Sequence, residues 1–174
     1  MAPAKLLVSV VDRLACVKIV GRANFSSSID FKMLINELQQ KGYLCYVIDL
    51  SECVLMDSTF LGVMAGFGLK MAQDAPAKDG AVIELFNPNP RISELLDNLG
   101  VLHLFKVFNG PLPVSPEMAA HVPAPAQAPT SDELRRNCLE AHRVLMSVSP
   151  ENVSKFKEVA QFLAEDLKKD KPAS

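Results

Sequence analysis

The chain has 174 residues and a net charge of −2, with 18 basic and 20 acidic side chains. This length is enough for one domain with a sizeable core and an additional segment. The near balance of charge and the absence of a long Lys/Arg cluster argue against a nucleic-acid partner. The longest uninterrupted apolar stretch, residues 60–69, is about half of what a bilayer span requires, so we predict a cytoplasmic protein without a membrane anchor.

Five short apolar segments in residues 1–109 predict β-strands, at 5–11, 14–20, 44–50, 81–86 and 105–108. Residues 12–13 separate the first two strands, which favours a hairpin. Helical patterns occupy the gaps between the later strands. This order predicts an α/β fold whose mixed, largely parallel sheet of four to five strands is connected by crossover helices.

Two of the predicted helices carry recognisable start and stop signals. Ser27 and Asp30 have capping-box spacing, and apolar residues then recur at helical spacing until Gly42. The second of these helices begins at Asn89 as a cap, with Pro90 in the first turn, and ends before Gly100.

The remaining helix follows the stretch VLMDSTFLGVMAGFG, residues 54–68. Either Asp57 or Ser58 is suited to cap its N-terminus. Apolar side chains cover every face of this helix, whereas packing on a sheet needs only one stripe. The surplus surface must therefore contact another part of this chain, a second copy or a partner protein. Its glycines indicate a close neighbouring backbone, either the domain's own sheet or another contact.

The same residues resemble a known family. Asp49-Leu50-Ser51 after a strand, then Met56-Asp57-Ser58-Thr59 and Leu61-Gly62-Val63 opening a helix, are similar to the STAS domain of bacterial anti-sigma factor antagonists. The resemblance covers residues 5–108 in element order and includes the Val20-Gly21 exit from the second strand. It implies a non-catalytic domain that needs no cofactor and takes part in transcription regulation by protein–protein interaction.

The resemblance also implies a regulatory site. The first hydroxyl after the Asp is the family's phosphorylation site, which is Ser58 here, with Thr59 as the alternative. The implied partners are an anti-sigma factor or regulatory serine kinase, bound when Ser58 is unmodified, and a serine phosphatase that reverses the modification. This chain has Phe60 where the family usually has Gly, and Asn24 where an acidic residue is common. The predicted partner surface comprises Asp57, Ser58, Thr59, Phe60, Asn24 and Val63.

Composition changes after residue 109. Residues 110–130 contain six of the twelve prolines and no periodic apolar pattern, which predicts a linker. Apolar side chains at helical spacing then predict a helical hairpin over 131–170, which turns at Ser149-Pro150-Glu151, and a tail at 171–174. The apolar stripe of its first helix comprises Leu134, Cys138, Ala141, Leu145 and Val148, and that of its second comprises Val153, Phe156, Ala160, Leu163 and Leu167. So small a hairpin must dock on the first domain, form a homodimer or bind a foreign helix.

The other reactive residue types are scattered. His103, His121 and His142 show no metal-binding spacing, and we predict structural or exposed roles for them. The four cysteines, Cys16, Cys45, Cys53 and Cys138, fit core packing better than a zinc or disulfide site.

Three functions other than a phosphorylation switch stay open from the sequence. In the first, Ser58 would be the nucleophile of a hydrolase, but the sequence has no G-x-S-x-G motif and no evident His and acid partners for it. A constitutive scaffold or oligomerisation module would use Ser58 only as a helix cap. An accessory domain that binds a small ligand is the last.

Overall fold

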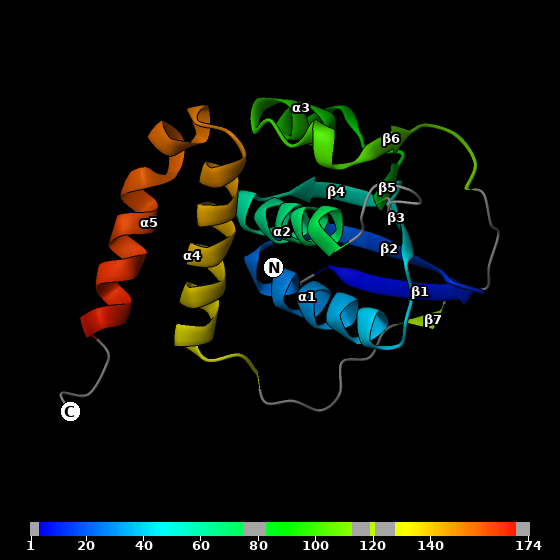
Figure 1. Cartoon of the computed structure of the whole chain (residues 1–174), viewed down its shortest axis with the longest axis horizontal. Coiled ribbons are helices and arrows are strands. Elements are labelled where there is room, and N and C mark those ends of the chain that lie inside the picture. The colour runs from blue at the N-terminus through cyan, green and yellow to red at the C-terminus, as the bar shows by residue number, and fades with distance from the viewer. Residues whose placement is uncertain (1–3, 75–82, 113–118, 121–127, 170–174) are drawn as a thin grey trace.

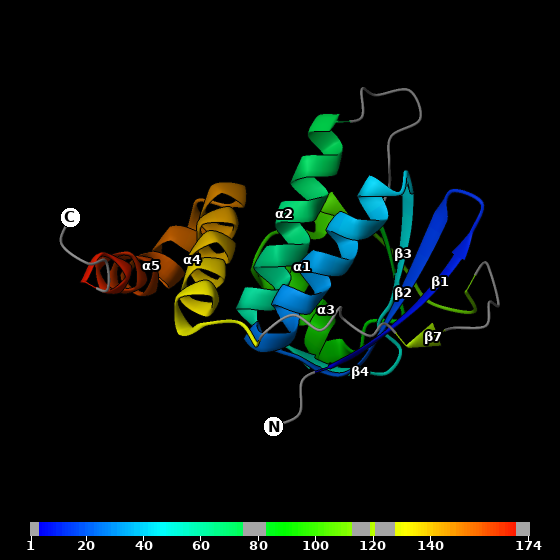
Figure 2. The same cartoon turned by 90° about the horizontal axis from the view of Figure 1, so that it is seen from below.

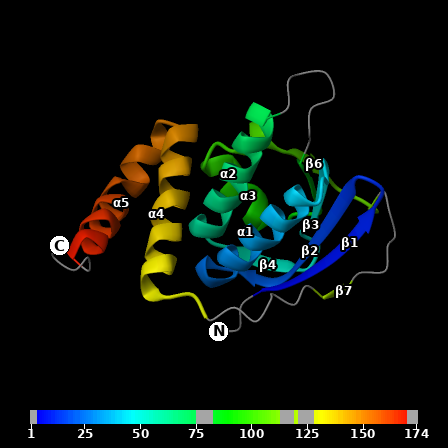
Figure 3. The ribbon, with the colours of Figure 1, turned by 60° about the horizontal axis from the view of Figure 1, so that its bottom comes forward.

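The computed structural model describes residues 4–74, 83–112, 119–120 and 128–169. Within them the chain forms three layers (Figures 2 and 3): a β-sheet, three helices against one face of that sheet, and an outer pair of helices. The outer pair is the predicted C-terminal hairpin, and Figure 1 shows it beside the rest of the chain. No helix of the described part is both long and apolar enough to cross a bilayer.

The predicted mixed sheet is confirmed. Strand β1 (Lys5–Val11) pairs antiparallel with β2 (Leu14–Ala23), and Asp12 in the turn adopts a φ of 53°. β3 (Cys45–Asp49), β5 (Ile83–Phe86) and β6 (Lys106–Phe108) follow in parallel, giving the order β6-β5-β3-β2-β1. The first two residues of the predicted strand 81–86 lie outside the described residues.

Two short strands were not indicated by the sequence. β4 (Cys53–Met56) forms where we expected a loop, and it pairs parallel with the end of β2. This pairing extends β2 three residues beyond its predicted end, past an irregularity in register between Gly21 and Arg22. β7 (Ala119–Ala120) lies within the predicted linker and pairs antiparallel with β1. The rest of 113–127, including His121, and the predicted tail lie outside the described residues.

Alternating residues on the strands separate two apolar clusters. Ala15, Val17 and Ile19 of β2 point into the main core, which the helices cover. Cys16 and Val47 point to the opposite face and form a small second cluster with Phe86. The side chains on one face of a strand recur every second residue, which is why the strands divide in this way.

Helix α1 (Phe25–Gln40) begins earlier than predicted. Asn24 is the N-cap: its side-chain oxygen accepts a hydrogen bond from the Ser27 backbone N–H at 3.1 Å, and the Asn24 N–H donates to Ser27 Oγ at 3.0 Å. Ser27 is thus the third residue of the first turn and not its cap, because Asn24 satisfies the free N–H groups one turn earlier.

Helices α2 (Ser58–Asp74) and α3 (Pro90–Asn98) start where we predicted, and a 3₁₀ turn η1 (Leu102–Leu104) follows α3. Asn89 caps α3 by accepting a hydrogen bond from Ile92 N–H at 2.9 Å. Gly100 ends this region with a φ of 65°, a conformation in which glycine is unstrained.

The C-terminal hairpin comprises α4 (Ser131–Val148) and α5 (Glu151–Lys169). Thr130 and Glu133 form a capping box at the start of α4. α4 packs mainly on α2 and less on α1, whereas α5 packs on α4. The hairpin therefore docks within its own chain, and it covers the surplus apolar surface of α2.

Two predicted details of the hairpin and the cysteines are wrong. Val153 belongs to the predicted apolar stripe of α5 but is 40% exposed, and Asn152 takes the buried position beside it. Cys16 and Cys53 are in the core, but Cys45 is exposed and Cys138 lies partly exposed between α2 and α4. Cys45 begins a strand, where its side chain meets solvent.

Candidate regulatory site at the head of α2

The pairing of β4 with β2 places the N-terminus of α2. Asp57 follows β4 directly, and its backbone N–H donates to the carbonyl of Ala23 at the end of β2, at 2.9 Å. Asp57 is the residue that caps α2, because its carboxylate accepts a hydrogen bond from Phe60 N–H at 2.8 Å. The heads of α1 and α2 therefore lie side by side.

Burial raises the pKa of the Asp57 carboxyl, because desolvation disfavours the charged form. Hydrogen bonds from the backbone N–H groups of Phe60, Phe25 and Thr59 oppose this increase, and His142 opposes it further. Phe25 begins α1, so one carboxylate receives amides from the first turns of both helices. A carboxylate in this position also interacts favourably with the two helix dipoles.

Ser58, the first residue of α2, contacts the C-terminal hairpin. Its side chain is partly buried, and Ser58 Oγ lies 3.0 Å from Nε2 of His142 on α4. The two residues are 84 positions apart in the sequence. The hydroxyl is therefore not simply exposed at the head of the helix, since one side of it is covered by α4.

The His142 ring contacts side chains of α2, α4 and α5. Its ring stacks on Phe156 of α5 with centroids 4.9 Å apart, and Nδ1 lies 3.5 Å from Cys138 Sγ. Burial lowers the pKa of His142, while hydrogen bonding to the Cys138 backbone and the charge of Asp57 oppose the decrease. A neutral imidazole has one donor and one acceptor nitrogen, so the direction of the hydrogen bond between Ser58 Oγ and Nε2 depends on the tautomer.

Two further polar contacts join α4 to the domain beside Ser58. Thr59 is buried, and its Oγ1 lies 3.3 Å from Cys138 Sγ. Asn137 is also buried and donates from Nδ2 to Ser28 Oγ of α1 at 2.8 Å. The head of α2 is therefore enclosed by polar as well as apolar contacts.

The other predicted partner-binding residues have different surroundings. Phe60 is 0% exposed and packs against Phe31, with ring centroids 5.0 Å apart, so its side chain belongs to the core and cannot contact a partner. Asn24 is partly buried as the cap of α1. Val63 is partly buried beside α4. Asp57, Ser58 and Thr59 are consecutive at the start of α2, and Ser58 and Thr59 contact α4.

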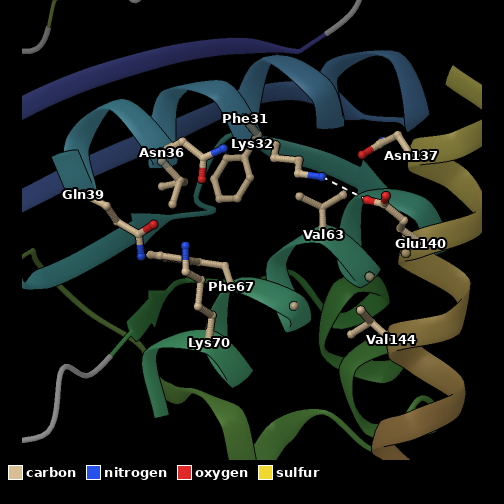
Figure 4. Close-up of a pocket in the computed structure, with 14 residues that line it drawn as sticks. Phe31, Lys32, Asn36, Gln39, Val63, Phe67, Lys70, Asn137, Glu140 and Val144 are labelled. Atoms are coloured by element: carbon tan, nitrogen blue, oxygen red, sulfur yellow. Dashed lines mark hydrogen bonds and ion pairs between the residues drawn. The ribbon is translucent and has the colours of Figure 1, made fainter. Parts of the chain in front are cut away.

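Below the head of α2, helices α1, α2 and α4 line a groove of about 330 Å³ that is open to solvent along one side. Figure 4 shows its apolar side chains, including Phe31, Val63 and Val144, with a Lys32–Glu140 ion pair at 3.1 Å across one side. The groove lies along one edge of the contact between α4 and the domain, and the charged side chains of this ion pair are exposed to solvent.

The site has only part of the chemistry of a nucleophilic enzyme. His142 is within hydrogen-bonding distance of Ser58, a partner that the sequence did not indicate. The group beside its second ring nitrogen is the Cys138 thiol, whereas nucleophile activation ordinarily uses a carboxylate there. No cluster of three His, Cys, Asp or Glu that could hold a metal ion forms among the described residues.

Sequence reasoning missed the residues that α4 contributes. His142, Cys138 and Asn137 all approach the head of α2, yet only Cys138 belonged to the predicted apolar stripe. His142 directly follows Ala141 of that stripe, so it lies at the edge of the buried face. That position was the available signal, but the sequence could not show which surface the stripe would meet.

Comparison with known proteins supports the fold. Residues 5–111 match the model of the STAS domain family. The structure of a protein from Thermotoga maritima that is assigned as an anti-sigma factor antagonist is similar, with 20% sequence identity and a TM-score of 0.53. The match covers 60% of this chain and 86% of the Thermotoga maritima chain. No curated protein matches the sequence.

Two structures of the anti-sigma factor antagonist SpoIIAA are also similar. The unphosphorylated form has 15% identity and a TM-score of 0.50, covering 61% of this chain and 89% of its own. The phosphorylated form, from Bacillus, has 16% identity and a TM-score of 0.50, with 61% and 91% covered. The family match spans more than half of the sequence, and this chain belongs to the STAS domain family.

Proposed function

We propose that this chain is a non-catalytic protein-interaction domain controlled by phosphorylation of Ser58. In this proposal it binds an anti-sigma factor or a regulatory serine kinase when Ser58 is unmodified, releases it when Ser58 is phosphorylated, and is reset by a serine phosphatase. The observation that carries the proposal is the position of Ser58 at the head of α2, on the face against which a helix packs.

The charge of a phosphate explains why one modification would release a partner. Phosphorylation adds a charge of about −1.5 to −2, which the free N–H groups and dipole of a helix N-terminus tolerate. At a docked interface the same group would lose water and lie beside the Asp57 carboxylate. A penalty of about 2.7 kcal/mol is enough to weaken binding about a hundredfold.

The similar proteins give this proposal a precedent. The Thermotoga maritima protein and SpoIIAA are both described as anti-sigma factor antagonists, and SpoIIAA has phosphorylated and unphosphorylated forms. Those descriptions support the same class of partner for this chain. The low identity leaves the identity of the partner to experiment.

Incubation of the full chain with ATP and lysate of its native host, followed by intact-mass measurement, tests the modification. We expect a gain of about 80 Da that disappears in Ser58→Ala and persists in Thr59→Ala. A gain lost only in Thr59→Ala would move the site to Thr59. The absence of any gain, or a gain that persists in both variants, would overturn the proposal.

A constitutive scaffold is the second candidate, and the Ser58–His142 hydrogen bond favours it. In that case Ser58 would contribute only to docking of α4, and the assembly would use another surface or a second copy. Recovery of the same partners by wild type, Ser58→Ala and Ser58→Asp from native lysate would support the scaffold. Loss of partners in Ser58→Asp alone would support the switch.

A further inference from the structure

The C-terminal hairpin lies along the surface of α2 that the proposed partner would use. Beyond the contacts of Ser58 and Thr59, Gly62 faces Ala141, and Gly66 faces Val144. A Cβ built on Gly62 would lie 2.5 Å from the Ala141 carbonyl oxygen, so the two helix backbones are in close contact. The hairpin thus covers α2 from its first turn to its third.

This contact has the properties of an interface that can open. Its polar pairs, Ser58–His142, Thr59–Cys138 and Asn137–Ser28, connect groups that water can satisfy after release. The groove between α1, α2 and α4 leaves one edge of this contact open to solvent. Contacts between domains of one chain are commonly more polar than a core and permit relative motion.

The covalent connection also permits release. Ten residues, 121–130, join β7 to the first residue of α4. A segment of that length can span up to about 35 Å when extended. Movement of the hairpin within that reach of β7 leaves the pairing of β7 with β1 intact.

We propose that the α4–α5 hairpin is an internal competitor for the α2 face, so that the partner and the kinase reach Ser58 only after the hairpin is released. This inference rests on the proposed function and adds its regulation. In the docked state His142 occupies the space beside the Ser58 hydroxyl that an incoming phosphate needs. In the released state the hydroxyl, Asp57 and the apolar surface of α2 become accessible together.

Docking and phosphorylation exclude one another because of distance and charge. A separation of 3.0 Å between Ser58 Oγ and His142 Nε2 leaves no room for a phosphorus atom between these two atoms, so a phosphate on Ser58 must displace His142 or turn away from α4. The neighbouring Asp57 carboxylate repels the added charge. Phosphorylation of the released state would therefore keep both the hairpin and the external partner away from α2.

The hairpin also indicates what the partner must present. A protein that replaces it has to place a helix across α2, because α2 offers a long apolar surface without free backbone groups. That helix needs a small residue opposite Gly62, where α4 has Ala141. It also needs a neutral polar side chain opposite Ser58, where α4 has His142.

Internal competition lowers the affinity for an external partner by the fraction of molecules that are open. If about one molecule in a hundred has a released hairpin, the apparent affinity is about a hundredfold weaker than the intrinsic one. The same fraction limits the rate of phosphorylation when opening is rare. Any change that favours release increases both.

A disulfide between α2 and α4 provides the direct test. A Cβ at position 66 would lie 3.5 Å from Val144 Cγ2, so Gly66→Cys with Val144→Cys places two thiols on facing sides of the contact. Intact mass without reducing agent establishes that the disulfide has formed before rates are compared. Both changes are made in the full chain with Cys45→Ser, which removes the exposed thiol. The reporter is the rate at which N-ethylmaleimide alkylates Cys138, measured by peptide mapping.

We expect the disulfide to slow alkylation of Cys138 at least tenfold relative to the variant with Gly66→Cys alone and the variant with Val144→Cys alone. In the background without the disulfide, Ser58→Asp should speed alkylation at least tenfold relative to Ser58→Ala, its matched control. Equal rates with and without the disulfide would overturn the proposal, because Cys138 would then react without release. Equal rates for Ser58→Asp and Ser58→Ala would overturn the exclusion between charge and docking.

Two further outcomes separate this inference from the proposed function. Phosphorylation of Ser58 by native lysate at the same rate with and without the disulfide would overturn the competition and leave the switch intact. If the disulfide slows alkylation of Cys138 as expected but native lysate does not phosphorylate Ser58, release of the hairpin is supported and the phosphorylation switch is overturned. Alkylation that slows as a dimer forms with rising protein concentration would place the hairpin on a second copy and overturn internal competition.

Discussion

His142 is the residue through which the appended hairpin contacts Ser58, the proposed modification site. Its ring is 5% exposed, lies between Ser58 and Phe156, and is neutral because burial lowers its pKa. When the hairpin is released, this ring is exposed to water and regains an ordinary pKa of about 6.5. The protonation of one side chain is therefore coupled to the position of two helices.

This coupling predicts that stability decreases on acidification below about pH 6.5. In that range the unfolded chain takes up a proton on His142 before the folded chain does, so the free energy of unfolding rises with pH by at most about 1.4 kcal/mol per pH unit. Urea unfolding between pH 5.5 and 8 should show this slope in the wild type. His142→Gln should lack it, and an unchanged slope would contradict the role of His142.

Asp57 contributes with the opposite sign at lower pH. Its pKa in the folded chain is raised above the ordinary value of 3.8, so the folded state takes up this proton first. Its effect begins just above pH 3.8, where stability decreases as the pH rises. The two contributions differ in sign, so the His142→Gln variant isolates the part of the slope that belongs to His142.

Asn152 fixes the turn between α4 and α5 to the end of α3. Its Nδ2 donates to the carbonyls of Leu99 and Leu145, each at 2.8 Å, and its side chain is 0% exposed. Asn152→Asp would place acceptor oxygens against two carbonyls and remove both donors. We expect a loss of about 3 kcal/mol or more in urea unfolding. Ser154→Asp, on the exposed side of the same helix, should change stability by less than about 0.5 kcal/mol.

At the scale of elements, α2 is the helix that both layers share. Its buried residues face the sheet, α1 and α4, and the third of these contacts depends on small residues. Gly62 and Gly66 lie on the same side of the helix, one turn apart, yet they meet α4 at different distances. The pair therefore offers a test in which the residue change is the same and only the contact differs.

Gly62→Ala and Gly66→Ala should have opposite effects. Both gain about 1 kcal/mol of helix propensity. At Gly62 the new Cβ would lie 2.7 Å from the Ala141 carbonyl carbon, so α4 must move away and docking should weaken. At Gly66 the nearest side-chain atom of Val144 is 3.5 Å away, an ordinary contact. Urea unfolding and Cys138 alkylation should show destabilised docking for Gly62→Ala only; the same result for both variants would contradict a close α2–α4 contact.

The whole molecule consists of a STAS domain and a hairpin that adds a third layer to it. The sheet and α1–α3 share a continuous core, whereas the hairpin contributes Leu145 and a few partly buried side chains to that core. Its contact with the domain also includes the polar pairs around Ser58, and a groove open to solvent runs along one edge. We therefore infer that the hairpin opens at a lower free energy than the sheet unfolds.

Native-state hydrogen exchange measures this difference directly. The opening free energy for amides of α4 and α5 should be at least about 2 kcal/mol lower than that for the β3 amides. This corresponds to exchange that is about thirtyfold faster. The Gly66→Cys/Val144→Cys disulfide should remove most of the difference, because it prevents release. Equal opening free energies for α4 and β3 in the wild type would identify one cooperative unit.

Much of this architecture follows from local sequence signals. Strand alternation, the Asn89-Pro90 helix start and the apolar stripes of the hairpin depend on residues close together in the chain, where backbone sterics and periodicity act. The acidic cap and the hydroxyl at the head of α2 belong to the same class. Asn24 was missed as a cap because Ser27 and Asp30 offered the same spacing three residues later.

The tertiary structure decided which surfaces meet. β4 forms because the end of β2 lacks another neighbour there, and no pattern within Cys53–Met56 distinguishes this short strand from a loop. His142 contacts Ser58 because α4 packs on the apolar face of α2 at Gly62, where the two helix backbones can approach closely. Such contacts join residues 84 positions apart, and their free energy depends on the fit of two complete surfaces, which neither segment encodes by itself.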